Sequence, residues 1–186
     1  ELDQNGQILY AAWLYLCWTG DLALIRKYWN KIVLAGDFPL LPVFRDATST
    51  LLRNKREFWE RDTRFGVEDG YELVYQFWVA FGLEKGAAVA RLLGDNGTAS
   101  RWEKAAANLK QVMLDHPTFR FIEDGHLIKR RTRDGRWHRY FIPADRAAMP
   151  PGSPIATLEK PEGDPDSGSL YPIIYGYVDP RGATAK

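Results

Sequence analysis

Residues 7–34 read QILYAAWLYLCWTGDLALIRKYWNKIVL and contain two different helical patterns joined by a Gly-Asp corner. The first pattern, Gln7–Trp18, carries no charged residue, so we expect a helix that is buried on every side. The second, Asp21–Leu34, has apolar residues at helical spacing and predicts a helix that covers a core with one face. Asp21 is the expected cap of the second helix, which makes the pair an αα-hairpin.

The same order of patterns returns later in the chain. Tyr71–Leu83 is again apolar nearly throughout, and the segment after it is again striped. Gly94-Asp95 forms the corner between them, and Trp102 follows this corner much as Trp29 follows the first one. Two hairpins with a shared corner and a shared Trp indicate an internal repeat of buried and covering helices. Gly82, inside the second apolar pattern, is expected to weaken or kink that helix.

Short β-type runs and loops occupy the rest of the chain. Thr50–Asp62 predicts a short helix, and the runs after Pro117 are separated by Asp-Gly pairs that favour hairpin turns. These runs are Phe119–Phe121, His126–Arg131 and Trp137–Phe141. We expect a small antiparallel excursion there, whose basic residues lie on a solvated edge. These basic residues are Lys129, Arg130, Arg131, Arg133, Arg136 and Arg139.

The remaining segments complete one predicted domain, residues 1–186. It divides into helical hairpins at 1–115, the β excursion at 117–142, a Pro- and Gly-rich loop at 143–169 and the start of a further hairpin at 170–186. The predicted fold class is mainly α.

Composition narrows the function classes. The chain has 186 residues and a net charge of +1, which gives no bulk attraction to nucleic acid or to an anionic membrane. Its apolar runs are shorter than the ~18 residues that predict a membrane span. The single cysteine, Cys17, is expected to be a buried thiol inside the first apolar helix. The three histidines lack ligand spacing and no phosphate-binding loop occurs, so we expect neither a metal nor a cofactor.

Carboxylates beside aromatic residues are the remaining candidates for chemistry. They occur at Trp59-Glu60, at Glu68-Asp69 before Tyr71, and at Asp3-Gln4 at the start of the first apolar helix. Acidic residues at helix starts also offset the helix dipole, and Glu60 could pair with arginines four residues away on a helix surface. Two carboxylates in an aromatic mouth are typical of glycoside hydrolysis, in which one acid protonates the leaving oxygen.

These motifs together resemble the six-hairpin glycosidases, which are built on an (α/α)6 toroid and include glucoamylase-, rhamnosidase- and trehalase-like enzymes. The resemblance runs from Asp3-Gln4-Asn5-Gly6-Gln7 to Thr19-Gly20-Asp21, through Phe58-Trp59-Glu60-Arg61, and from Gly70-Tyr71 to Leu93-Gly94-Asp95 and Trp102. It implies a partial toroid of helical hairpins that carries the small β insertion. The chain would then be a fragment of a catalytic domain whose remainder supplies the second carboxylate.

The resemblance also assigns roles to individual residues. It places Glu60 on the Trp-Glu motif that contributes the general acid, and it leaves Glu68 and Asp69 as alternative catalytic carboxylates. The residues expected to bind a carbohydrate substrate are Asp3, Gln4, Trp59, Arg61 and Tyr71. Two other functions remain open: a non-catalytic helical-repeat interaction module, and a polysaccharide lyase on a similar toroid, which the basic residues near Arg131 would suit.

Overall fold

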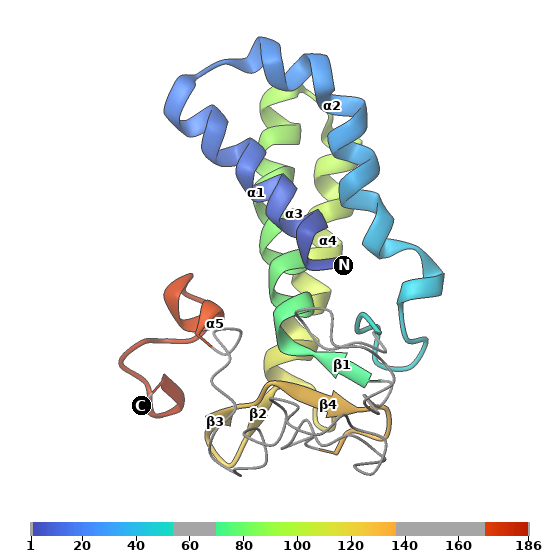
Figure 1. Cartoon of the computed structure of the whole chain (residues 1–186), viewed down its shortest axis with the longest axis vertical. Helices are drawn as coiled ribbons and strands as arrows, with labels where there is room; N and C mark the ends of the chain where they lie inside the picture. Colours follow the sequence, from blue (N-terminus) through green and yellow to red (C-terminus); the bar gives the residue numbers. More distant parts are fainter. Residues whose placement is uncertain (1, 54–69, 137–169, 186) are drawn as a thin grey trace, which may run out of the picture. The chain divides into compact units, whose positions relative to one another are not determined.

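The computed structural model describes residues 2–53, 70–136 and 170–185 of the chain (Figure 1). Within these residues the protein is mainly helical, with two small antiparallel pairs of strands. The chain divides into two compact units. The first unit is Glu1–Leu52 with Tyr75–Asp115, and the second is Arg53–Val74 with His116–Lys186.

The first unit is built from two helical hairpins. Their helices are α1 (Leu2–Thr19), α2 (Leu22–Asp37), α3 (Leu73–Leu93), whose first two residues belong to the second unit, and α4 (Asn96–Asp115). Short 3-10 turns, η1 (Phe38–Leu40) and η2 (Pro42–Phe44), follow α2. The two αα-hairpins predicted from the sequence are confirmed.

The corners of both hairpins have the same construction. Gly20 and Gly94 adopt φ of +67° and +82°, the left-handed conformation that glycine enters at little cost. Asp21 and Asp95 follow, and the Oδ1 of each accepts a hydrogen bond of 3.1 Å from the backbone N–H three residues on. Each aspartate therefore caps its helix as predicted, which satisfies an amide that the helix start leaves unpaired.

Burial follows the predicted alternation in the second hairpin. Nearly every side chain of α3 from Leu73 to Leu83 is buried, whereas α4 buries one stripe and exposes the opposite face. The stripe consists of Thr98, Ala99, Trp102, Ala106, Leu109, Val112 and Met113. In the first hairpin, α2 is likewise striped and packs Ile25 into a core with Leu16 of α1 and Val89 of α3.

The prediction that the first apolar helix is buried on every side is wrong in this structure. Leu2, Leu9 and Leu16 of α1 are buried, but Ile8 is 47% exposed and Trp18 is 87% exposed. Cys17 is exposed as well, so the expected buried thiol is also a wrong prediction. The apolar residues of α1 surround the whole helix, whereas the other helices of the first unit cover only one side of it.

Glycines bring α1 and α3 into close contact. A Cβ on Gly82 would collide with the carbonyl oxygen of Gly6, and a Cβ on Gly6 would collide with the carbonyl of Trp78. A Cβ on Gly86 would lie 2.8 Å from the ring of Trp102. Because α3 runs unbroken from Leu73 to Leu93, Gly82 serves close packing rather than the expected kink.

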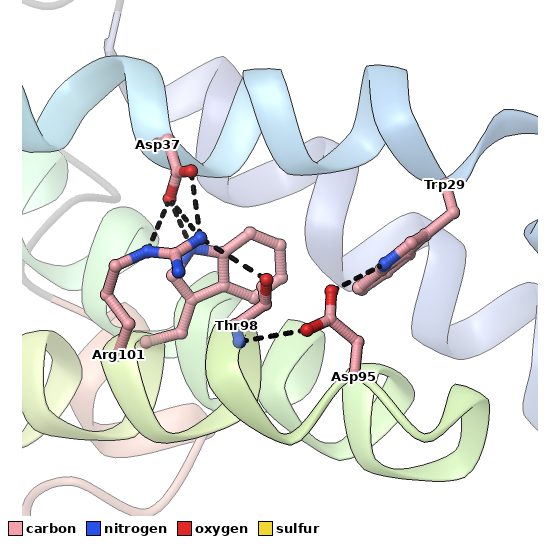
Figure 2. Close-up of polar contacts among 6 residues, drawn as sticks. Trp29, Asp37, Asp95, Thr98 and Arg101 are labelled. Atoms are coloured by element: carbon pink, nitrogen blue, oxygen red, sulfur yellow. Dashed lines mark hydrogen bonds and ion pairs between the residues drawn. The ribbon is translucent and has the colours of Figure 1, made fainter.

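Two indole–carboxylate hydrogen bonds tie the hairpins together (Figure 2). Trp29 Nε1 donates to Asp95 Oδ2 (3.0 Å), and Trp102 Nε1 donates to Asp37 Oδ1 (2.8 Å). Asp37 also accepts from the guanidinium of Arg101 at 2.9–3.2 Å. The two indole rings meet edge to face at 5.7 Å. Each tryptophan of the repeat thus bonds to a carboxylate of the other hairpin, which fixes α2 alongside α4.

The second unit contains the strands. β1 (Gly70–Glu72) pairs antiparallel with β4 (Arg130–Thr132), and β2 (Ile122–Glu123) pairs with β3 (His126–Leu127). The predicted hairpin turn at Asp124-Gly125 is confirmed, since both residues have positive φ, as a two-residue primed turn requires. α5 (Tyr171–Ile174) and η7 (Ala183–Ala185) complete the described elements.

Several predicted boundaries were wrong. Tyr71 lies in β1 rather than at the start of an apolar helix, because its backbone pairs with Arg131 of β4. Thr50 has φ +63° and Leu52 bridges Arg45, so no helix begins at Thr50. The run 119–121 is not a strand, and the expected new helix after residue 170 is limited to α5. The β-type run predicted at 137–141, the loop predicted at 143–169 and residues 54–62 of the predicted helix lie outside the described residues.

Candidate functional site

Most of the predicted site residues lie in 54–69, outside the described residues. They are Trp59, Glu60, Arg61, Glu68 and Asp69. The structure describes the other three within two different units. Asp3 and Gln4 occupy the first turn of α1, and Tyr71 lies in β1 of the second unit.

Asp3 is a buried carboxylate at the start of α1. Its side chain is 2% exposed, and Gln7 Nε2 donates a hydrogen bond to its Oδ2 at 3.0 Å. A carboxylate in the first turn also interacts favourably with the helix dipole. Gln4, on the next position, is exposed. Asp3 is thus held by a carboxamide one turn further along α1, an arrangement that fixes the orientation of its oxygens.

Two aromatic residues, Tyr10 and Trp13, lie on the same side of α1 as Asp3 and Gln7. Because an α-helix completes a turn about every 3.6 residues, Asp3, Gln7, Tyr10 and Trp13 follow one another along one face, which we call the α1 row. Tyr10 and Trp13 are half-buried and stack with ring centroids 5.8 Å apart and planes at 16°. Tyr10 also contacts the buried ring of Phe81 at 5.0 Å. The α1 row therefore joins a carboxylate and a carboxamide to aromatic surface.

Lys85 of α3 adds a positive charge to the α1 row. Its Nζ lies 5.0 Å from the centroid of Trp13 and 4.9 Å from that of Phe81, both within the range of cation–π attraction. The lysine is half-buried, so the two rings fix its position while it stays in contact with solvent. Sequence reasoning missed it, although Lys85 is the first cation after the apolar run of α3 and could have been noticed as such.

Tyr71 is enclosed within the second unit. Its side chain is 1% exposed, and its ring meets Phe119 edge to face at 5.6 Å. A carbohydrate stacks on an aromatic face that solvent can reach, so in this structure Tyr71 contributes packing.

The basic residues of the second unit are not all on a solvated edge, so that prediction was wrong. Arg130 and Glu72 form an ion pair of 3.0 Å, and both side chains are 0% exposed. They face each other across the β1–β4 ladder, where Glu72 is the register partner of Arg130. The sequence contains no local signal of this pair, because the two strands lie about sixty residues apart.

Arg131 is also buried, and it is bound on several sides. Its guanidinium lies 2.6 Å from Glu123 and donates to the backbone carbonyls of Arg120 (2.7 Å) and Gly135 (3.0 Å). These bonds fix the backbone around the β4 strand. Arg133 and Arg136 are exposed, and Arg139 lies outside the described residues.

Two features are absent from the described part of the chain, a metal-binding group and a membrane-spanning helix. In 2–53, 70–136 and 170–185, no three His, Cys, Asp or Glu side chains come together as a metal-binding group. No helix in the same parts of the chain has both the length and the apolar character needed to cross a membrane. Comparison of the chain with known protein families, with curated proteins and with solved structures finds no match.

Proposed function

We propose that this chain belongs to the catalytic domain of a glycoside hydrolase that cleaves glycosidic bonds in oligo- or polysaccharides. The observation that carries the proposal is the construction of the second hairpin, in which residues 73–83 of α3 are buried and α4 covers them with one face. A ring of such hairpins needs inner helices that are apolar on several sides and outer helices that are apolar on one. The exposed Ile8 and Trp18 of α1 provide a surface on which a neighbouring hairpin would pack.

The α1 row supports a carbohydrate as the substrate. Sugars present hydroxyl groups at their edges and an apolar C–H face, so their sites combine carboxylates or carboxamides with aromatic rings. Gln7, which the buried Asp3 holds in place, supplies the first kind of group, and Tyr10 and Trp13 supply the second. The row begins at the first turn of α1. In a toroid of helical hairpins, the N-terminal ends of the inner helices surround one mouth, so the row would lie at that mouth if α1 is an inner helix.

The proposed chemistry is carboxylate acid–base catalysis without a cofactor. Glu60 would protonate the leaving glycosidic oxygen, and a second carboxylate would activate water or attack the sugar. Glu68 and Asp69 are the alternative acids. These assignments rest on the resemblance of the Trp59-Glu60 motif, which lies outside the described residues.

The experiment is a turnover assay of the full-length protein on a panel of aryl glycosides and natural oligosaccharides. Glu60→Gln keeps the shape of the side chain but removes the proton donor, so we expect a loss of about 10²-fold or more in kcat. Glu103→Gln is the matched control, because Glu103 is an exposed carboxylate on the outer helix α4. It should keep wild-type turnover.

Other outcomes would redirect the proposal. Unchanged turnover in Glu60→Gln with loss in Glu68→Gln or Asp69→Asn would move the acid to that residue. Absence of hydrolysis by the wild-type protein across the panel would contradict a glycosidase. An ultraviolet-absorbing unsaturated product from a uronate polymer would instead indicate a lyase. The described residues give the lyase little support, because Arg130 and Arg131 are engaged inside the second unit.

A further inference from the structure

The solvent side of α2 differs from that of its counterpart in the repeat, α4. Large apolar side chains lie exposed on α2: Leu24 is 38% exposed, Tyr28 44% and Leu34 71%. Along α4, all of which is described, every large apolar side chain is at least partly buried. The two helices occupy equivalent places in the two hairpins, so the position in the fold does not require the apolar surface on α2. Such a surface, unlike single exposed apolar residues, indicates a contact site.

The exposed apolar residues of α2 are interleaved with cations. Leu24, Lys27, Lys31 and Leu34 follow one another at helical spacing, with Tyr28 beside them, and we call these five residues the α2 outer face. Lys27 Nζ lies 5.4 Å from the centroid of the Tyr28 ring. Residues 22–36 contain Arg26, Lys27 and Lys31 and no Asp or Glu. The carboxylates at the two ends of α2 are bound by other side chains, Asp21 by the hydroxyl of Tyr15 and Asp37 by Arg101.

The charges on the exposed side of α4 also differ from those on the α2 outer face. Its exposed residues include both signs, and Glu103 pairs with Arg91 of α3 at 2.6 Å. Arg101 pairs with Asp37 at 2.9 Å. The outer side of α4 is therefore electrostatically balanced by its own neighbours, whereas the α2 outer face carries an excess of positive charge.

We propose that the α2 outer face docks an acidic amphipathic helix of a partner protein. Lys27 and Lys31 are one turn apart, so Glu or Asp residues one turn apart on a partner helix would reach both. Leu24 and Leu34 lie at the two ends of this row, where aliphatic residues of the partner would cover them. Leu41 and Val43, just beyond α2, are also exposed and would extend the apolar end of the contact.

Two other occupants fit the surface less well. A membrane-surface helix keeps its cations on the polar side and its apolar face free of charge, whereas Lys27 and Lys31 stand within the apolar row. A symmetric dimer through this face would place α2 against α2 and bring the lysines of both copies together, which like-charge repulsion opposes. The proposal is independent of the glycosidase assignment, because it uses an outer helix.

The test measures binding of a synthetic helical peptide to the full-length protein by fluorescence anisotropy. On one face of the peptide helix, two Glu residues stand four positions apart and Leu residues flank them. A second peptide has Gln in place of every Glu. We expect the acidic peptide to bind, and the Lys27→Gln/Lys31→Gln double variant to weaken it by about tenfold. Leu34→Ser should weaken it as well. All replaced side chains are exposed, so circular dichroism should show unchanged folding.

Lys104→Gln is the matched control, because it removes an exposed lysine from the counterpart helix α4. It should leave the affinity within about twofold of wild type. Equal binding of the Gln peptide, or an equal loss with Lys104→Gln, would overturn the proposal. So would tighter binding to phosphatidylserine vesicles than to the peptide, or a wild-type dimer that Leu34→Ser dissociates. Failure of the acidic peptide to bind would overturn it too.

Discussion

Trp29 Nε1 lies 3.0 Å from Asp95 Oδ2, and this hydrogen bond joins the first hairpin to the corner of the second (Figure 2). Asp95 also caps α4 through its other oxygen, which accepts from the backbone N–H of Thr98 at 3.1 Å. The carboxylate of Asp95 thus caps α4 and also holds Trp29 of α2 beside it. Asp37 at the end of α2 provides the reciprocal bond for Trp102, so the tryptophan of each hairpin is bonded to an aspartate of the other.

Trp29→Phe should destabilise the protein by about 1 kcal/mol, because it keeps most of the ring packing and removes one hydrogen bond to a carboxylate. Urea unfolding followed by circular dichroism measures the change. Trp18→Phe is the matched control: its indole is exposed, and its unfolding free energy should stay near that of wild type. If both variants lose the same stability, the bond to Asp95 contributes nothing specific.

The stability of the first unit should fall in acid partly through Asp95. The backbone N–H of Thr98, and after it the indole of Trp29, lower the pKa of Asp95 below its ordinary value. The unfolded chain then binds more protons than the folded chain, so this stabilisation is complete above the unfolded pKa of about 3.9. It is lost as the pH falls through the lower folded pKa.

Asp95→Asn tests this pH dependence, because asparagine still caps a helix but does not titrate. Between pH 7 and pH 2 the unfolding free energy of the wild-type protein should fall more steeply than that of the variant at the acid end. The difference between the two proteins should therefore narrow below about pH 4. Parallel curves over the whole range would contradict this role of Asp95.

Gly82→Ala should destabilise the first unit by about 2 kcal/mol or more, because the new methyl group would collide with the backbone of Gly6 and neither backbone can move aside freely. Gly97→Ala is the control in a described helix with space around it, since the nearest atom to its Cβ is 3.9 Å away. It should be neutral or stabilise α4 by up to about 1 kcal/mol. Thermal unfolding of both variants checks the difference, and a tolerated Gly82→Ala would contradict the close crossing of α1 and α3.

Glu72→Gln should cost about 3 kcal/mol or more, because it removes the charge of a buried carboxylate that pairs with the buried guanidinium of Arg130. Arg91→Gln breaks the exposed pair with Glu103 and should cost less than about 1 kcal/mol. Hydrogen exchange of the backbone amides in β1 and β4 would locate the effect in the second unit. Equal small losses in both variants would show that the Glu72–Arg130 pair is not enclosed.

Local sequence signals predicted the elements that local forces determine. The Gly-Asp corners, the stripe of α4 and the turn at Asp124-Gly125 each depend on a few neighbouring residues. The burial of α1 could not be predicted in this way, because it depends on what packs around the helix. Likewise, the pairing of Glu72 with Arg130 depends on strands that are far apart in the sequence. The apolar pattern that starts at Tyr71 therefore predicted a helix where the chain forms β1.

Only a part of the predicted site, namely Asp3, Gln4 and Tyr71, lies in the described residues. Asp3 lies at the start of an apolar helix as expected. Its hydrogen bond from Gln7 fits helical spacing, but the sequence does not show that Asp3 is buried and therefore relies on this bond. Lys85 was missed because its contact with Trp13 joins two helices that are far apart in the chain. Such contacts require the packing of α1 on α3, which the glycines at their crossing determine.

The most direct test of the central proposal is the dependence of hydrolysis on the leaving group. A general acid is needed for an alcohol leaving group but scarcely for dinitrophenolate, which leaves without protonation. Glu60→Gln in the full-length protein should therefore lower kcat/KM for a natural oligosaccharide by about 10²-fold or more. It should lower kcat/KM for the dinitrophenyl glycoside far less. Equal losses on both substrates, or no loss on either, would contradict Glu60 as the acid of a glycoside hydrolase.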